Sequence, residues 1–181
     1  MTATISAGTD VDPAEAPNSS GVFVIAISER IFIAHPPATV WSVLSDPETV
    51  VTLVEGSRIG EHHDDGTFDA FLAVRFAGIK VAFKAVVDLT LHPETLTGRL
   101  EGTGGDSRGS TRVKGDAEFA VISEDGGSTV TVAGGAEVTG ALAGLVSTGA
   151  SIVVARMVKS FTKNLALKCA EVENDESETA R

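Results

Sequence analysis

The stretch GALAGLVSTGASIVVARMVKSFTKNLALKCA, residues 140–170, contains no proline and no acidic residue. Its apolar side chains recur every three or four residues, at Leu142, Val146, Ala150, Val153, Met157, Phe161 and Leu165. This spacing places them on one face of a helix, because an α-helix has 3.6 residues per turn. A helix of about 30 residues is about 45 Å long. We therefore expect one long C-terminal helix around which the rest of the chain is arranged.

Residues 22–139 show mainly the alternation of apolar and polar side chains that is typical of β-strands. The pattern is clearest at 79–91, where every second residue is apolar and Lys80, Lys84 and Asp88 lie between. Such alternation predicts strands with one buried and one solvated face. Asp65-Gly66 predicts a tight hairpin turn between two of the strands. We expect seven antiparallel strands, the first at 22–33.

Two proline motifs interrupt this pattern after the first strand. His35-Pro36-Pro37 starts one helix, because proline is tolerated in the first helical turn. Asp46-Pro47-Glu48 starts another, with Asp46 as the N-cap and Glu48 favourable to the helix dipole. We therefore predict two short helices within residues 37–54.

The predicted fold class is α+β. A curved, seven-stranded antiparallel sheet grips the long C-terminal helix, and two short helices follow strand one. We expect a flexible leader at 1–20, the folded domain at 21–170, and an acidic, disordered tail at 171–181.

Charge and composition exclude several classes of protein. The formal net charge is −11, and nucleic-acid binding is not expected because it needs clustered cations. The single cysteine, Cys169, excludes an internal disulfide and is typical of a reducing compartment; we expect a buried, inert thiol. No signal peptide and no apolar run long enough to span a membrane are recognisable. The predicted location is cytoplasmic, with transient contact at the inner face of the membrane.

Glycines recur on the inward faces of the last three predicted strands, among them Gly98, Gly102, Gly115 and Gly134. Glycine within a strand marks a bend or the close approach of another body. Two interpretations remain open. Either the sheet curves strongly and leaves room beneath it, or the small residues let the long helix pack closely.

Several motifs together resemble a known family. They are HPPATVWSVLSDPETV at 35–50, Val81-Ala82-Phe83-Lys84, the Gly-rich segments at 101–104 and 109–113, and Gly-x-Leu-Ala-x-Leu at 140–145. With these residues the chain resembles the G-subunit family of carbon monoxide dehydrogenase, a branch of the START-like helix-grip superfamily. The resemblance covers about residues 22–170. Two features depart from it: Glu55-Gly56 replaces a common Pro-Gly, and residues 171–176 are acidic where some relatives carry a membrane-associating extension.

The resemblance implies a helix-grip cavity for an apolar ligand, such as a quinone or another isoprenoid lipid, and no covalent cofactor. It also implies a role beside a redox enzyme such as a molybdenum-containing dehydrogenase, which the protein recruits to the membrane or serves there. The candidate lining residues are Trp41, Leu72, Val74, Phe76, Val81, Phe83, Phe119, Val153, Met157 and Phe161. For each of them the alternative is plain core packing.

No catalytic or metal-binding constellation is recognisable in the sequence. His62 and His63 are neighbours on a strand, so their side chains point to opposite faces and do not share a metal ion. Gly102-Thr103-Gly104 lacks the third glycine and the following helix of a dinucleotide fingerprint. We therefore predict a protein without catalytic residues and without a metal.

Two carboxylates and one basic strip complete the candidates. Glu137 falls in the polar register of its strand and is expected to face solvent. Glu29 falls in the apolar register: either it orients a ligand in the cavity, or it lies at an edge near water, and a buried charge needs a partner such as Arg30 or Arg75. The basic strip comprises Arg156, Lys159 and Lys163, and two interpretations of it remain open. Either these cations are solvated and interact with the negative C-terminal end of the helix, or they form a docking surface for an acidic partner or anionic lipid headgroups.

The preferred function is therefore a non-catalytic protein that binds an apolar ligand. Two alternatives remain. One is an enzyme of the polyketide cyclase or aromatase type, which needs acid–base groups inside the cavity. The other is an adaptor with a filled core that acts through the basic strip.

Overall fold

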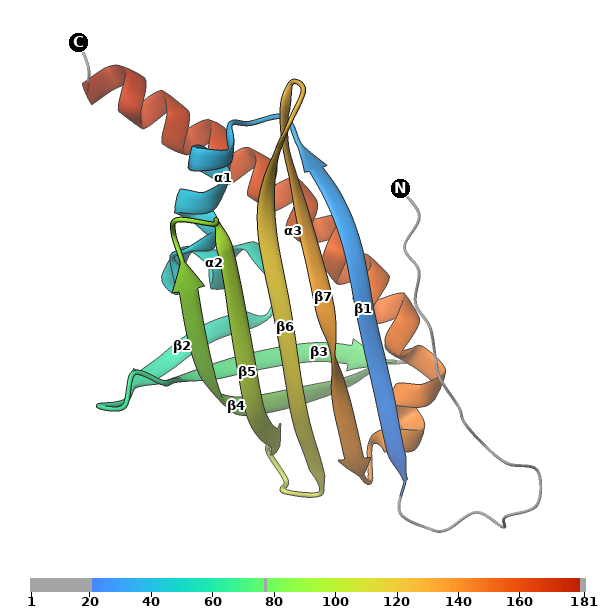
Figure 1. Ribbon diagram of the computed structural model, residues 1–181. Coiled ribbons are helices and arrows are strands. Elements are labelled where there is room, and N and C mark those ends of the chain that lie inside the picture. Colours follow the sequence, from blue (N-terminus) through green and yellow to red (C-terminus); the bar gives the residue numbers. More distant parts are fainter. Residues whose placement is uncertain (1–20, 77, 180–181) are drawn as a thin grey trace.

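The computed structural model describes residues 21–179 except 77, and the side chains of 76, 145–150 and 176–179 also lie outside the description. The predicted leader at 1–20 is thus outside the described residues. Figure 1 shows a twisted sheet with a long helix across one face. The elements are β1 (Val22–Ile33), α1 (Pro37–Leu44), α2 (Pro47–Leu53), β2 (Ser57–His62), β3 (Phe68–Phe76), β4 (Ile79–His92), β5 (Thr97–Asp106), β6 (Thr111–Glu124), β7 (Gly127–Gly140) and α3 (Ala143–Thr179).

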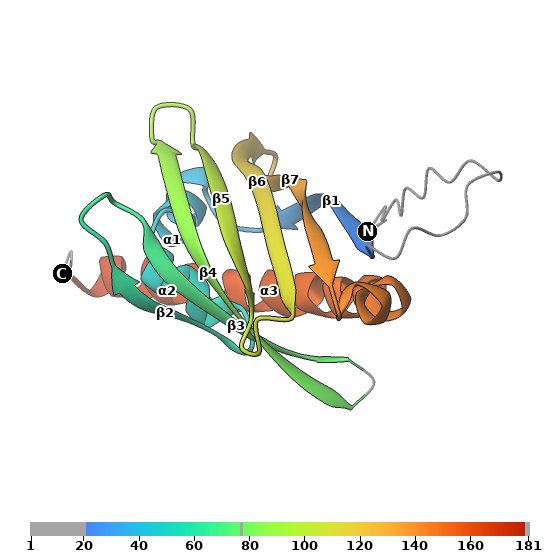
Figure 2. The same ribbon diagram turned by 90° about the horizontal axis from the view of Figure 1, so that it is seen from below.

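All seven strands form one antiparallel sheet in the order β1-β7-β6-β5-β4-β3-β2. The chain runs as a meander from β2 to β7, and β1 pairs with β7 along its whole length. β3 and the first part of β4 run across the direction of β6 and β7 in Figure 1, whereas the second part of β4 bends to run beside β5. Figure 2 shows the sheet curving over α3. The predicted α+β fold, a curved seven-stranded antiparallel sheet that grips a long C-terminal helix, is confirmed.

The alternation in the sequence determines which side chains face α3. In the β3–β4 pair Leu72 lies opposite Phe83 and Val74 opposite Val81, and the two valines are buried. The intervening Lys80 and Lys84 are exposed. Gly66 closes the β2–β3 hairpin at φ +88°, a conformation that side chains disfavour.

The two short helices begin at their prolines as predicted. The Asp46 side chain caps α2 by accepting a hydrogen bond from the backbone N–H of Glu48 at 3.2 Å, which satisfies one of the free amides of the first turn. α1 buries Val40, Val43 and Leu44 against the core. Together the helices cover the end of the sheet nearest the C-terminal part of α3 (Figure 1).

α3 is longer than predicted, at 37 residues. Residues 171–179, expected to be part of a disordered tail, are helical, so that prediction is wrong over this range. Tertiary contacts explain the difference. Val172 packs against the core, and the Glu173 carboxylate lies 3.0 Å from His35 Nδ1 and 3.4 Å from Thr39 Oγ1. Such packing stabilises a helix beyond its local propensity.

The hydrophobic core is divided between the two ends of α3. One cluster gathers around Leu165 and Cys169 with α1 and the ends of β1 and β7. The other joins Val74, Val81 and Val138 and is contacted by Leu142, Val153 and Met157. Between these clusters the middle of α3 faces the centre of the sheet, where the candidate site lies.

Candidate functional site

A two-lobed cavity lies between the concave face of the sheet, α2 and the middle of α3. The lobes have volumes of about 520 Å³ and 450 Å³. They share one wall, made by Val50, Val51, Val54, Ala70, Leu100 and Met157. Because both lobes contact the same side chains, they are neighbouring parts of one hollow. This size is typical of a site for a small molecule.

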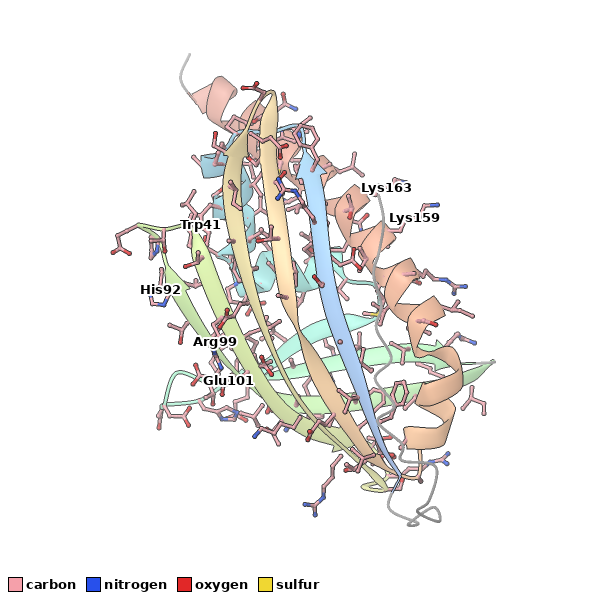
Figure 3. All side chains as sticks on the ribbon, turned by 45° about the vertical axis from the view of Figure 1, so that its right-hand side comes forward. Trp41, His92, Arg99, Glu101, Lys159 and Lys163 are labelled. Atoms are coloured by element: carbon pink, nitrogen blue, oxygen red, sulfur yellow. The ribbon has the colours of Figure 1, made fainter. Side chains whose placement is uncertain are left out.

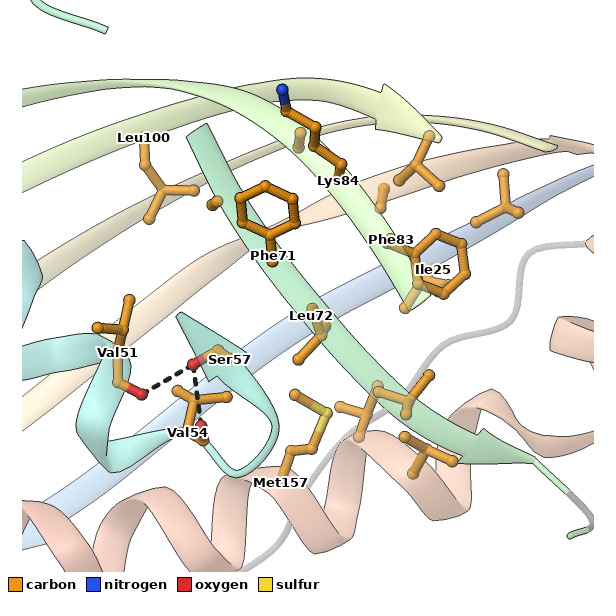
Figure 4. Close-up of a pocket in the computed structure, with 18 of the residues that line it drawn as sticks. Ile25, Val51, Val54, Ser57, Phe71, Leu72, Phe83, Lys84, Leu100 and Met157 are labelled. Carbon is orange, nitrogen blue, oxygen red and sulfur yellow. Dashed lines mark hydrogen bonds between the residues drawn. The ribbon is translucent and has the colours of Figure 1, made fainter. Parts of the chain in front are cut away.

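The larger lobe extends towards the N-terminal part of α3. Figure 4 shows Ile25, Leu72 and Phe83 on the strands above Met157, with Val51 and Val54 beside them at the end of α2. Val74, Val113, Val138, Val153 and Val154 complete most of the remaining wall. The lobe is therefore lined almost entirely by aliphatic and aromatic carbon.

The smaller lobe extends towards α1. Its sheet wall comes from the strands, and its floor from Val158 and Phe161 of α3 and Leu44 of α1. The strand residues are Ile27, Glu29, Ile31, Phe68, Val87, Leu89, Ala117, Phe119, Val130 and Val132. Among the described residues that line this lobe, Glu29 is the one with a charged side chain.

The exposure of one inward-facing side chain, Leu100, supports an open cavity between the sheet and α3 rather than a closed core. Leu100 lies opposite Leu89 and Ala117 on the α3 side of the sheet, yet 36% of its surface is accessible. The accessible surface faces the hollow, because Leu100 lines both lobes. An inward leucine in a close-packed protein core would be buried.

The inward glycines do not mark close contact with α3. A Cβ on Gly98 would collide with the Phe119 ring, and one on Gly104 would collide with the backbone of β4 at Lys84. These neighbours belong to the sheet itself. Of the two interpretations of these glycines, the geometry supports a strongly curved sheet with space beneath it.

The polar side chains of the larger lobe already have partners. Ser57 Oγ lies 2.8 Å from the carbonyl oxygen of Val51 and 2.9 Å from that of Val54 (Figure 4). Lys84 Nζ contacts Asp69 Oδ2 at 2.7 Å, so Lys84 contributes its carbon stem to the wall. The Lys84 ammonium, aided by His63, holds the pKa of Asp69 below its ordinary value.

Most of the predicted lining residues lie at the cavity. Leu72, Val74, Phe83 and Val153 line the larger lobe, Phe119 and Phe161 the smaller one, and Met157 lines both. The side chain of Phe76 is outside the described residues.

Contrary to expectation, Trp41 and Val81 do not belong to the described lining of either lobe. The Trp41 ring of α1 packs against Phe119, with the ring centroids 6.0 Å apart. Val81 is buried in the core cluster of Val74 and Val138. Both side chains face the interior, and both fill space there instead of bordering the hollow.

Sequence reasoning missed the wall that α2 forms. Val50, Val51 and Val54 have the spacing of the apolar side of a short helix, which is equally compatible with core packing. Leu100 and Ile25 were also missed as lining residues. Their inward register was predictable, but the space in front of them was not, because packing volume leaves no signal in a single sequence.

The basic strip, Arg156, Lys159 and Lys163, lies on the exposed side of α3, turned away from the cavity. Figure 3 shows Lys159 and Lys163 projecting from the outer side of the helix. Ile152 and Leu167 flank the strip and are 67% and 55% exposed. Within the described part of the chain no carboxylate forms an ion pair with these three cations.

The adjacent histidines have separate partners. His62 contacts Glu48 at 3.2 Å, and His63 contacts Asp69 at 3.3 Å. The two rings therefore contact different carboxylates.

Among the described residues no group of three or more His, Cys, Asp or Glu side chains is arranged to hold a metal ion. Nor does any described helix combine the length and the apolar character needed to cross a membrane.

Solved structures with the same fold include a conserved bacterial protein, an aromatase/cyclase and a synthase. A conserved protein from Geobacillus kaustophilus is 20% identical, with a TM-score of 0.66 over 80% of this chain and 93% of that one. ZhuI aromatase/cyclase from Streptomyces sp. R1128 is 18% identical, with a TM-score of 0.59 over 81% of this chain and 94% of that one. Norcoclaurine synthase from Thalictrum flavum is 13% identical, with a TM-score of 0.51 over 87% and 99%. At these identities the likeness shows the fold alone.

Sequence comparison gives a more specific result. No curated protein matches the chain. The model of one family, the G subunit of carbon monoxide dehydrogenase (CoxG), matches residues 30–170. This range includes the helix motif at 35–50, most of the sheet, and the part of α3 that lines the cavity. The chain therefore belongs to the CoxG family.

Proposed function

We propose that this protein is a non-catalytic carrier of an apolar ligand, a quinone or another isoprenoid lipid, that serves a redox enzyme at the membrane. One observation carries the proposal: the two-lobed cavity is lined almost wholly by carbon. Transfer of an apolar molecule into such a site is driven by removal of its surface from water. The two connected lobes suit a ligand with a long chain.

The redox partner is inferred from the family. The family's name refers to a subunit of carbon monoxide dehydrogenase. We therefore propose a molybdenum-containing dehydrogenase, or a related redox enzyme, as the partner of this chain. An apolar electron carrier held in the cavity would connect such an enzyme with the membrane.

An enzyme of the cyclase type is the second candidate, because the fold resembles that of an aromatase/cyclase. Acid–base catalysis needs positioned ionisable groups within reach of a substrate. In the described lining, Glu29 and Lys84 are the charged residues, and the Lys84 ammonium is paired with Asp69. This favours the carrier over the enzyme.

The binding experiment is native mass spectrometry of gently purified protein, followed by identification of the extracted lipids. We expect a one-to-one adduct with an isoprenoid lipid or quinone. Phe83→Trp in the larger lobe and Phe161→Trp in the smaller lobe should each reduce adduct formation with a retained fold. A clean ligand-free mass under conditions that preserve lipid adducts of a known carrier would refute the proposal.

The basic strip gives the carrier a place to contact the membrane. We propose that Arg156, Lys159 and Lys163 bind anionic headgroups while Ile152 and Leu167 touch the interface, an arrangement typical of interfacial helices. Each cation near such a surface contributes about 1 kcal/mol.

Vesicle co-sedimentation tests this contact. Lys159→Glu/Lys163→Glu should abolish binding to vesicles of phosphatidylglycerol and phosphatidylcholine and leave ligand binding intact. The control, Arg112→Glu/Lys114→Glu, makes the same charge change on the exposed face of β6. If both double variants lose vesicle binding equally, net charge rather than the strip is responsible.

A further inference from the structure

Among the polar side chains that line the described cavity, Glu29 stands apart because its polar atoms have no partner in the described protein. Ser57 and Lys84, the other polar lining residues, direct their polar atoms to backbone carbonyls and to Asp69. The Glu29 carboxylate makes no hydrogen bond or ion pair with any described residue. The described polar side chains of the larger lobe are therefore paired, whereas the Glu29 carboxylate of the smaller lobe has no partner among the described residues.

The register of β1 explains the position of Glu29. It lies opposite Val132 of β7, in the row of inward residues that includes Ile27 and Ile31. Arg30, the neighbour considered as its partner, pairs with Glu124 at 3.5 Å instead and is exposed. Adjacent residues of a strand face opposite sides, so Arg30 points away from the cavity.

The surroundings of Glu29 are otherwise apolar. Phe119, Val132, Val158 and Phe161 line the same lobe. Removing water from a carboxylate in such a place is unfavourable, unless a hydrogen-bond donor replaces that water. A purely apolar ligand filling this lobe would remove the water and supply no donor.

From this we propose that the ligand is an apolar molecule bearing a hydroxyl group, which donates a hydrogen bond to Glu29 in the smaller lobe. The inference rests on the proposed carrier function and narrows its ligand class. A carboxylate accepts hydrogen bonds and donates none. Glu29 thus selects a hydroxyl over an ether or a carbonyl, and so selects the reduced, hydroxyl-bearing form of a ring redox pair over its oxidised form.

Farnesol and farnesyl methyl ether are matched probes for this inference. They share one isoprenoid chain, and they differ in whether the oxygen can donate. Affinities of the full-length protein for each are measured by isothermal titration calorimetry. A hydrogen bond to a charged group predicts a preference of about tenfold or more for farnesol in the wild type.

Two variants and one control complete the experiment. Glu29→Gln can donate to the ether oxygen, and Glu29→Leu can neither donate nor accept, so both should abolish the preference for farnesol. Glu137→Gln removes the same charge from the exposed, outer face of β7 and should keep the preference. Circular dichroism and the thermal midpoint establish that each variant is folded.

The outcomes separate the two proposals. A farnesol preference that disappears in both Glu29 variants and persists in Glu137→Gln supports the inference. Tight binding of both probes with no preference in the wild type overturns it and leaves the carrier function standing. If neither probe binds and native mass spectrometry shows only ligand-free protein, the carrier function and the inference are both rejected.

Discussion

Gly102 leaves space on the concave face of the sheet, next to residues that line the cavity. It lies on β5 opposite Val87 of β4 and Gly115 of β6, on the face towards α3. A Cβ at this position would meet only Val87 Cγ2 at 3.6 Å and the Val86 carbonyl oxygen at 3.8 Å. Both distances are ordinary contacts, so a Cβ fits at this position, and we expect a larger side chain to extend from it into the hollow.

Gly102→Leu should therefore weaken ligand binding and preserve the fold. The added carbons occupy ligand volume, and overfilling a fitted site costs about 1–3 kcal/mol. Displacement of a fluorescent apolar probe measures the change in affinity. Thr103→Leu, at the exposed next position of the same strand, should bind as the wild type does. Unaltered affinity in Gly102→Leu would mean that the ligand does not occupy this part of the cavity.

Cys169 is predicted to be chemically inert in the folded protein. Its side chain is fully buried beside Leu165, and burial, with a smaller effect of Glu173, raises the pKa of the thiol to about 11. Because the thiolate is the reactive form, Ellman's reagent should label native protein at least about a hundredfold more slowly than protein unfolded in guanidinium. Rapid labelling of the native protein would show that the C-terminal end of α3 opens readily.

At the scale of elements, the β3–β4 pair is reinforced on its outer face by an ion pair. Asp69 of β3 is buried and lies 2.7 Å from Lys84 of β4 and 3.3 Å from His63. The hydrogen bond from Lys84 is the main reason why the pKa of Asp69 lies below its ordinary value of 3.8. The ion pair joins two of the strands that contribute to the sheet wall of the larger lobe.

Asp69→Asn should change how stability depends on pH. A carboxylate whose pKa is lowered by folding stabilises the protein above its unfolded pKa, and this contribution is lost as pH falls through its folded pKa. The variant should be less stable than the wild type at pH 7, and the gap should close below pH 3.8. Urea unfolding of both proteins between pH 7 and about pH 3, below the ordinary pKa of Asp69, measures this difference in the free energy of unfolding. Asp88→Asn, an exposed site on β4, should show a smaller gap at pH 7; a gap for Asp69→Asn that is constant with pH contradicts the argument.

At the scale of the whole molecule, the core is split and the space between its halves is open. The cluster at Leu165 ties α1 to α3, and the cluster at Val74 and Val138 ties the sheet to the start of α3. These two clusters hold the sheet and α1 against α3, and they leave the space between them unfilled. A ligand that bridges the lobes would add apolar contacts that the ligand-free protein lacks.

Ligand binding should accordingly raise the thermal stability of the whole domain. A ligand at a hundred times its dissociation constant stabilises the folded state by about 2.7 kcal/mol. For a domain of this size that corresponds to a rise in Tm of about 5–10 °C. Differential scanning calorimetry with and without farnesol measures the shift. No shift at saturation, confirmed by direct titration, would mean that the ligand binds the unfolded chain equally well.

Particular residues show how far the sequence could predict the site. Leu72, Phe83 and Met157 lie where the sequence places them, because alternation and helical spacing determine which way a side chain faces. Trp41 faces the interior too, but it fills the space under α1 against Phe119. Facing inward does not distinguish a cavity wall from a packed core.

The sequence alone determined the order of the elements, the inward and outward faces of the strands, the cap of α2 by Asp46 and the apolar face of α3, because each depends on neighbours close along the chain. The tertiary structure decided that α3 continues to Thr179, that a hollow remains between the core clusters, and that Glu29 has no partner among the described residues. Those properties depend on distances between segments far apart in sequence. Local pattern specifies the direction of a side chain, and only the folded chain specifies what lies in front of it.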